Sequence, residues 1–175
     1  MSLSVEPVII RPMTAADMDR VLAISAQLKE APQWPRAVYE AIVHSVDGDS
    51  GTRRRVALVA CDAGSGLVAG FVVASLVAPE GELETVGVGS EFQRRGIAGQ
   101  LVIEIGKIFR LQGVTKVLLE VRDSNLAAKG LYVSSGFRET SRRPSYYGDP
   151  IEDAVVMELH LGAAEGCWRS KNAPV

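Results

Sequence analysis

The stretch from residue 82 to residue 113 constrains the fold most, because its pattern changes from strand to helix across one glycine-containing turn. Residues 82–88 read as a β-strand, and Ile97, Leu101 and Ile105 then recur at helical spacing. A strand that leads through such a turn into a helix brings free backbone N–H groups to the end of the strand. The stretch therefore predicts an α/β arrangement whose turn can bind an anion.

The rest of the chain continues this alternation of strand and helix. Strands are predicted at residues 8–11, 55–62, 67–78, 82–88, 114–121, 137–140 and 154–161, and helices at residues 14–28, 37–46, 97–113 and 125–135. The predicted order is β-αα-ββ-β-α-β-α-β-β. It forms one α/β domain with a mixed sheet over residues 1–161, and residues 162–175 follow as a tail without periodicity.

Composition excludes several classes of protein. The formal net charge of −2 gives no basic excess, so a nucleic acid is not expected as a partner. Cys61 and Cys167 lie far apart without a CxxC spacing, which argues against a metal site and a disulfide framework. The longest apolar run, residues 66–78, is shorter than the roughly 20 residues that span a bilayer. We expect a cytoplasmic protein with no membrane partner, either a monomer or a homodimer.

The turn at residues 93–99, Gln-Arg-Arg-Gly-Ile-Ala-Gly, is the candidate anion site. Glycine permits close approach of the backbone to a ligand, and the two arginines can pair with phosphate oxygens. The pattern GxxxxGK[ST] does not occur, and the run that starts at Gly87 lacks the third glycine of GxGxxG. The turn alone indicates only an anion, and an ordinary capping turn remains the alternative.

Glu120 is the first candidate for chemistry, because it stands at the carboxyl end of the apolar strand 114–121. Ligands of an open α/β sheet bind beside the carboxyl ends of its strands. A carboxylate at that end can accept a proton from a substrate. The alternative is a structural salt bridge to Arg122 or Arg138.

Residues 93–98 resemble the Q/R-x-x-G-x-G/A motif of the GNAT superfamily of N-acetyltransferases, with Ala98 in place of the commoner last glycine. Several further segments are similar to the ribosomal-protein-alanine N-acetyltransferases within it. These segments are residues 10–17, 81–85, 119–125, 128–137, 142–147 and 152–154. The resemblance covers roughly residues 8–161 and implies the GNAT fold, with acetyl-CoA as co-substrate.

The resemblance also implies which residues contact acetyl-CoA. Val86, Gly87 and Val88 would pair their backbone with the pantetheine arm, although Gly87 stands where a small alanine is usual. Asn125 would hydrogen-bond the cofactor near its thiol end. The pyrophosphate would lie on Arg94, Arg95, Gly96, Ile97, Ala98 and Gly99.

For catalysis, the resemblance matches Glu120 to the family's proton acceptor and Tyr132 to its general acid. Glu82 is the rival base, at the spacing that histone-type members use, or else it binds the substrate ammonium. Tyr146 and Tyr147, expected in the loop between the last two strands, would wall the slot for the first residues of the substrate. Ordinary roles remain open: core packing for Tyr132 and surface packing for the tyrosine pair.

The function that these residues imply is transfer of acetyl from acetyl-CoA to the α-amino group of a protein N-terminus, by direct attack. The N-terminal alanine of a ribosomal protein is the acceptor implied by the resemblance. One alternative is a GNAT enzyme that acetylates lysine or a small amine. A second alternative, from another class, is an acyl-CoA-binding sensor without turnover, which would have no need of both Glu120 and Tyr132.

Overall fold

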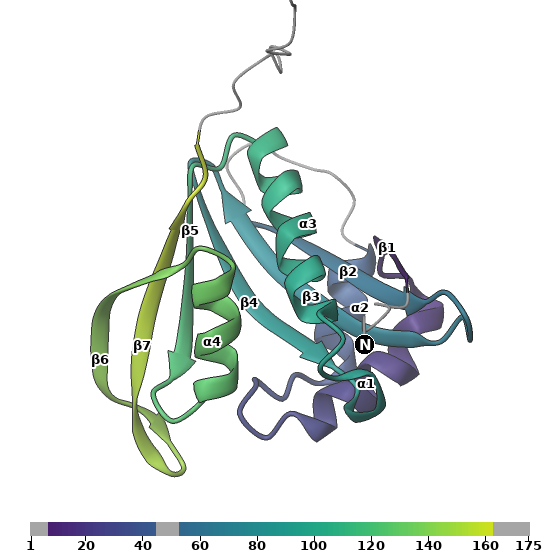
Figure 1. The fold of residues 1–175 in the computed structure, drawn as a ribbon, viewed down its shortest axis with the longest axis horizontal. Coiled ribbons are helices and arrows are strands. Elements are labelled where there is room, and N and C mark those ends of the chain that lie inside the picture. The colour runs from purple at the N-terminus through teal and green to yellow at the C-terminus, as the bar shows by residue number, and fades with distance from the viewer. Residues whose placement is uncertain (1–6, 45–52, 163–175) are drawn as a thin grey trace, which may run out of the picture.

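The fold is a seven-stranded mixed sheet with helices on both faces (Figure 1). The computed structural model describes residues 7–44 and 53–162. The elements are β1 (Val8–Pro12), α1 (Met18–Gln27), α2 (Arg36–His44), β2 (Arg54–Asp62), β3 (Val68–Val77), β4 (Glu80–Val88), α3 (Ile97–Leu111), β5 (Lys116–Arg122), α4 (Leu126–Ser134), β6 (Arg138–Gly148) and β7 (Ile151–His160), with short 3-10 turns η1 (Ala15–Asp17) and η2 (Ser90–Phe92). The predicted order of strands and helices is confirmed.

The strands lie in the order β1-β2-β3-β4-β5-β7-β6. Neighbouring strands are antiparallel except β4 and β5, which run parallel. A parallel pair needs a crossover, and α3 supplies it between these two strands. The mixed α/β sheet predicted from the sequence is therefore confirmed.

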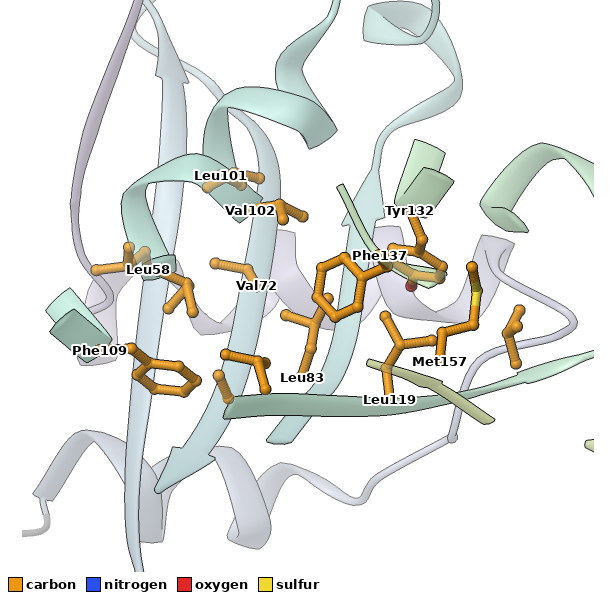
Figure 2. Close-up of a cluster of buried hydrophobic side chains, with 14 of the residues drawn as sticks. Leu58, Val72, Leu83, Leu101, Val102, Phe109, Leu119, Tyr132, Phe137 and Met157 are labelled. Atoms are coloured by element: carbon orange, nitrogen blue, oxygen red, sulfur yellow. The ribbon is translucent and has the colours of Figure 1, made fainter. Parts of the chain in front are cut away.

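Helices α3 and α4 cover one face of the sheet, in front in Figure 1. Their apolar side chains form the larger core with β2, β3, β4, β5 and β7. Figure 2 shows Leu101, Val102 and Phe109 of α3 on one side of this core, and Tyr132 of α4 beside Phe137 on the other. The buried residues of β5 alternate, which leaves Leu118, Glu120 and Arg122 on the opposite face.

Helices α1 and α2 cover that opposite face and form the second core. Val21 and Ile24 of α1 and Tyr39 of α2 are fully buried there against Phe71 of β3. The entry to α1 is held by Asp17, whose buried carboxylate binds Arg11 at 2.7 Å and accepts the Thr14 amide at 2.8 Å. On this face α1 and α2 lie against β2, β3 and β4, so these three strands are covered on both faces.

The two halves of the sheet separate between β4 and β5. Their pairing covers three positions and ends where Glu82 lies opposite Leu118, while β4 stays paired to β3 as far as Val88. Figure 1 shows the two strands diverging beyond that point. Residues 83–88 of β4 consequently have one edge to which no strand of the described chain is hydrogen-bonded.

The prediction for the last two strands was wrong in its boundaries. A strand at 137–140 followed by a loop that holds Tyr146 and Tyr147 was expected, but β6 continues to Gly148 and both tyrosines lie within it. The register of β7 explains the difference, because its residues pair with β6 along almost its whole length. Nearly every residue of β6 is exposed, so the strand has no apolar alternation to reveal it.

Some predictions concern residues outside the described ranges, namely the end of the second helix at 45–46, Cys167 and the tail after Gly162. Within the described ranges, no helix has the length and apolarity needed to cross a membrane. In that same part of the chain, no three His, Cys, Asp or Glu side chains are grouped to hold a metal ion.

Candidate active site

The turn between β4 and α3 leaves the start of the helix open to a ligand. Its N-cap is Gly96, with a φ of +76° and no capping side chain, and Arg94 is also left-handed with a φ of +65°. The first helical bond runs from Gln100 N to Gly96 O at 3.1 Å, so the amides of residues 97–99 have no partner within the helix. A β-carbon added at Gly96 would meet no atom within 4 Å.

This turn is anchored to the rest of the molecule from the side of α1. Arg20 binds Glu91 of η2 and also donates to the carbonyl of Val68 at 3.1 Å. Gln27 accepts the amide of Ser90 at 3.2 Å. The predicted anion-binding loop is therefore a fixed loop in front of an uncapped helix.

The free edge of β4 leads directly into this loop. Gln93 donates its side-chain amide to the carbonyl of Val88 at 3.2 Å. Gly87 faces α1, where a β-carbon would come within 2.4 Å of Leu28 Cδ1 and 2.9 Å of Phe71 Cε1. Close packing beneath the strand is the physical reason for glycine where alanine is usual in the family, and the strand edge stays available.

Glu120 lies on β5 just beyond the point where the strands separate. Its carboxylate pairs with Arg143 of β6, with 3.1 Å between Glu120 Oε1 and Arg143 Nε. The two salt-bridge partners considered from the sequence, Arg122 and Arg138, are not the partner found in the structure. Sequence reasoning missed Arg143 as a contributor to this site, although it lies in one of the segments that carry the resemblance.

The two tyrosines of β6 gather around Glu120. A hydrogen bond with Glu120, assisted by burial, raises the pKa of the Tyr146 phenol. Burial, followed by the charge of Glu120, raises the pKa of Tyr147. The rings of Tyr146 and Tyr147 pack edge to face, with 5.2 Å between their centroids. The guanidinium group of Arg122 stacks on Tyr147, with 4.2 Å between Arg122 Cζ and the ring centroid.

Tyr132 approaches this group from the other face of the sheet. Its side chain is buried in the larger core, edge to face with Phe137 at 5.8 Å between centroids (Figure 2). Burial and then the neighbouring Tyr147 raise the pKa of the Tyr132 phenol to about 12. The phenol therefore keeps its proton at neutral pH, so it can act as a donor.

Asn125 is the N-cap of α4. Its Oδ1 accepts the amide of Ala128 at 3.0 Å, a common capping bond that satisfies one free N–H group of the helix. Its side-chain NH₂ group remains for a second partner. The structural role explains why an asparagine begins this helix, and it leaves the predicted contact with the cofactor open.

Glu82, the rival base, lies on β4 at the last position that pairs with β5. Glu82 forms an ion pair with Arg53. Glu84, two residues further along β4, forms an ion pair with Arg55, with 2.9 Å between Glu84 Oε2 and Arg55 Nε. Arg55 in turn stacks on Trp34, with 5.5 Å between Arg55 Cζ and the ring centroid. Trp34 is half-buried and lies just before α2. The charge of Glu82 also acts on Tyr146, so Glu82 borders the group around Glu120.

A concavity of about 560 Å³ lies at the turn end of the β6–β7 hairpin, where Tyr147 pairs with Glu152. Its lining residues are Asp123, Ser124, Pro150, Ile151, Glu152 and Asp153. Its acidic side chains are already paired: Asp123 binds Lys129, Glu152 binds Arg122, and Asp153 accepts the Ser145 amide. This concavity belongs to the framework of the hairpin and holds none of the predicted site residues.

Comparisons with known proteins identify the family to which the chain is similar. The chain is 34% identical over 166 residues to the N-alpha-acetyltransferase RimI of Mycobacterium tuberculosis, which covers 93% of this chain and 98% of that protein. It is 38% identical over 96 residues to the ribosomal protein bS18-alanine N-acetyltransferase of Salmonella typhimurium. That second match covers 54% of this chain and 65% of the relative's length.

Solved structures share the fold. The ribosomal-protein-S18-alanine N-acetyltransferase of Escherichia coli superposes with a TM-score of 0.71 at 26% identity, covering 93% of this chain and 99% of that one. Arabidopsis thaliana NAA60 with a bisubstrate analogue gives a TM-score of 0.76 at 21% identity, over 90% of this chain and 100% of that one. The model of the acetyltransferase (GNAT) family matches residues 21–137. The chain belongs to this GNAT family of acetyl-CoA-dependent N-acetyltransferases.

Proposed function

We propose that the chain transfers an acetyl group from acetyl-CoA to the α-amino group of a protein N-terminus, and that the N-terminal alanine of a ribosomal protein is an acceptor. The observation that carries this proposal is the group formed by Glu120, Tyr146 and Tyr147 where β4 and β5 separate. The relatives named as N-alpha- and ribosomal-protein-alanine acetyltransferases support the choice of acceptor.

The chemistry of this group suits a peptide N-terminus. Glu120 offers a carboxylate to an ammonium group, and the amphipathic rings of Tyr146 and Tyr147 can pack against a peptide backbone. An α-amino group has an ordinary pKa of about 8, so a carboxylate is a sufficient base near neutral pH. A lysine side chain, with a pKa of about 10.4, would demand more of the same base.

The residues on the cofactor side fit acetyl-CoA, which supplies the activated acetyl thioester when it binds. The amides of residues 97–99 have no helical acceptor, and with the left-handed backbone at Arg94 and Gly96 they offer N–H groups that suit a pyrophosphate. The free edge of β4 at residues 86–88 offers backbone groups to the amides of a pantetheine arm. Asn125 retains a donor for the region near the thiol.

Substitution of Gly96 tests the pyrophosphate site, and Gly113 provides a matched control. Both glycines have nearly the same left-handed φ, +76° and +78°, and neither has an atom within 4 Å of an added β-carbon. Gly96→Ala and Gly113→Ala should each lose about 1 kcal/mol of unfolding free energy. Only Gly96→Ala should weaken CoA binding, by about 10-fold or more, because its methyl group enters the space for phosphate.

Chemical denaturation measures the first effect, and calorimetric titration with CoA measures the second. Gly113 lies at the opposite end of α3, roughly 25 Å from Gly96 at 1.5 Å per helical residue, so it cannot reach the same ligand. Equal CoA affinities for the two variants would mean that the pyrophosphate binds elsewhere.

In the proposed reaction, Glu120 accepts a proton from the acceptor ammonium so that the neutral amine can attack the thioester carbonyl carbon. As the carbon–sulfur bond breaks, Tyr132 donates its proton to the departing sulfur, and the second proton that the nitrogen loses on amide formation returns the Tyr132 phenolate to its phenol form. Its phenol is suited to that role because burial keeps it protonated. Arg143 must leave Glu120 as the ammonium arrives, and its side chain is 57% exposed, so the exchange requires no change in the core.

The direct test is mass spectrometry of peptides incubated with the protein and acetyl-CoA. Peptides that begin with Ala, Ser or Met, each also containing an internal lysine, should gain one acetyl group on the α-amino nitrogen. The peptide that carries a ribosomal N-terminal alanine should react fastest. Acetylation confined to lysine side chains would reject the proposed acceptor, and binding of acetyl-CoA without turnover on any amine would favour a sensor.

A further inference from the structure

Strand β6 contains an irregularity beside the acceptor site. Arg143 pairs with Ala154 and Tyr147 pairs with Glu152, so residues 144–146 of β6 face a single residue of β7. An insertion of this kind locally bends a strand and redirects its side chains. It lies between the two positions whose side chains contact Glu120 and its surroundings.

The bulge changes the directions in which the side chains of Tyr146 and Tyr147 point. Adjacent residues of a regular strand point to opposite faces of the sheet. Tyr146 and Tyr147 nevertheless both act on Glu120, and their rings are in contact. Ser145, immediately before them, has a left-handed φ of +50°, which changes the direction of the chain at that point. The bulge therefore allows two consecutive tyrosines of one strand to lie near the same carboxylate, that of Glu120.

Asp153 is the residue of β7 that faces the bulge, and its Oδ1 accepts the Ser145 amide at 2.9 Å. A left-handed backbone is costly for any residue other than glycine, so it persists only where surrounding contacts hold it. A carboxylate that accepts a backbone N–H forms a strong hydrogen bond of the kind that can do so. Among the described residues, no hydrogen bond or ion pair joins the Asp153 side chain to Glu120, Tyr132 or Tyr146.

We infer that Asp153 is a positioning residue of the acceptor site, whose carboxylate holds the bulge that directs Tyr146 and Arg143 to Glu120. The inference rests on the proposed function, because it assigns the bulge to binding of the acceptor peptide. Cofactor binding should not depend on it, since the candidate acetyl-CoA residues lie on β4, α3 and the start of α4.

The test compares Asp153→Ala with Asp153→Asn. Asparagine keeps an oxygen at the Oδ1 position and should keep the bulge, whereas alanine removes it. We expect Asp153→Ala to raise the KM for the acceptor peptide about 10-fold, with the KM for acetyl-CoA changed less than about 2-fold. Asp153→Asn should stay within about 3-fold of the parent protein. Glu158→Ala, at the far end of β7, is the matched control and should resemble the parent.

A second measurement does not depend on turnover. With 3-fluorotyrosine at position 146, the ¹⁹F resonance of the parent protein should shift when Glu120→Gln is introduced, because the phenol contacts that carboxylate. In a protein that also carries Asp153→Ala, Glu120→Gln should leave the ¹⁹F resonance at position 146 unchanged. In a protein that carries Asp153→Asn instead, Glu120→Gln should shift that resonance as it does in the parent.

These two measurements separate the inference from the proposed function. A full ¹⁹F response in Asp153→Ala, or an unchanged KM for the acceptor peptide, would overturn the positioning role. If the parent protein acetylates no peptide N-terminus but the ¹⁹F responses follow the expected pattern, the bulge assignment stands and the proposed acceptor fails.

Discussion

Replacement of Glu120 by glutamine is expected to lower kcat/KM for an N-terminal peptide roughly 100- to 10,000-fold at pH 7, the usual range for loss of a general base. Glutamine keeps the size of the side chain and removes its charge. Glu120 is 23% exposed and lies outside the larger core, so the substitution leaves the packing intact. Peptide acetylation followed by mass spectrometry gives the rate, and a melting curve checks the fold.

The pH dependence of the same variant separates a base from a mere binding group. A free α-amino group has an ordinary pKa of about 8, so most acceptor molecules are already neutral at pH 9. The loss of kcat in Glu120→Gln should therefore shrink as the pH rises from 7 to 9. A loss that stays constant over that range would mean that Glu120 binds the acceptor without removing its proton.

Glu82→Gln is the matched comparison, because Glu82 also borders Tyr146 and is also paired with an arginine. We expect its kcat to fall less than about 10-fold, with the main effect on acceptor KM. The reverse result, a large loss of kcat in Glu82→Gln and a small one in Glu120→Gln, would transfer the role of base to Glu82.

Much of the fold could be predicted because local patterns determine it. The change from strand to helix periodicity on the two sides of Gly96 is visible in the sequence, and so is the apolar, β-branched run 114–121 that forms β5. Glycine at position 96 meets a local requirement as well, namely a left-handed φ at an uncapped helix start. Features of this kind need no information from distant residues.

The features that could not be predicted depend on register between distant strands. Pairing of β4 with β5 ends at Glu82, and no local signal in the sequence marks that residue. Strand β6 was predicted too short because an exposed edge strand lacks apolar alternation. Its register with β7 brings Arg143 within reach of Glu120, whereas sequence reasoning considered Arg122 and Arg138.

The role of Tyr132 illustrates the limit of reading a single residue. Its position four residues before Gly136 and near Phe137 is compatible with core packing, and the structure does bury it against Phe137 in the larger core. The proposal that it also acts as an acid comes from family resemblance and from its closeness to Tyr147. One side chain can meet both requirements, because the ring packs while the hydroxyl remains for chemistry.

Tyr132→Phe should consequently lower kcat about 10-fold or more while it preserves the packing of the ring. The KM for acetyl-CoA should change little, because the hydroxyl acts on the leaving sulfur and not on the cofactor in its ground state. Single-turnover acetylation of an N-terminal peptide measures the effect on the chemical step. A variant that turns over normally with an intact fold would remove Tyr132 from the mechanism and leave it as a core residue.

The pKa of the phenol supplies an independent check on the same variant. Burial raises that pKa from 10.0 to about 12 in the folded protein, so the folded state holds the proton more tightly than the unfolded state does. The parent protein should therefore lose stability as the pH rises from about 10 toward 12, and Tyr132→Phe should lose correspondingly less over that window. Denaturant unfolding of both proteins across this range measures the difference. Below pH 10 the phenol stays protonated, so any alkaline decline of kcat in that range must come from another group and should persist in Tyr132→Phe.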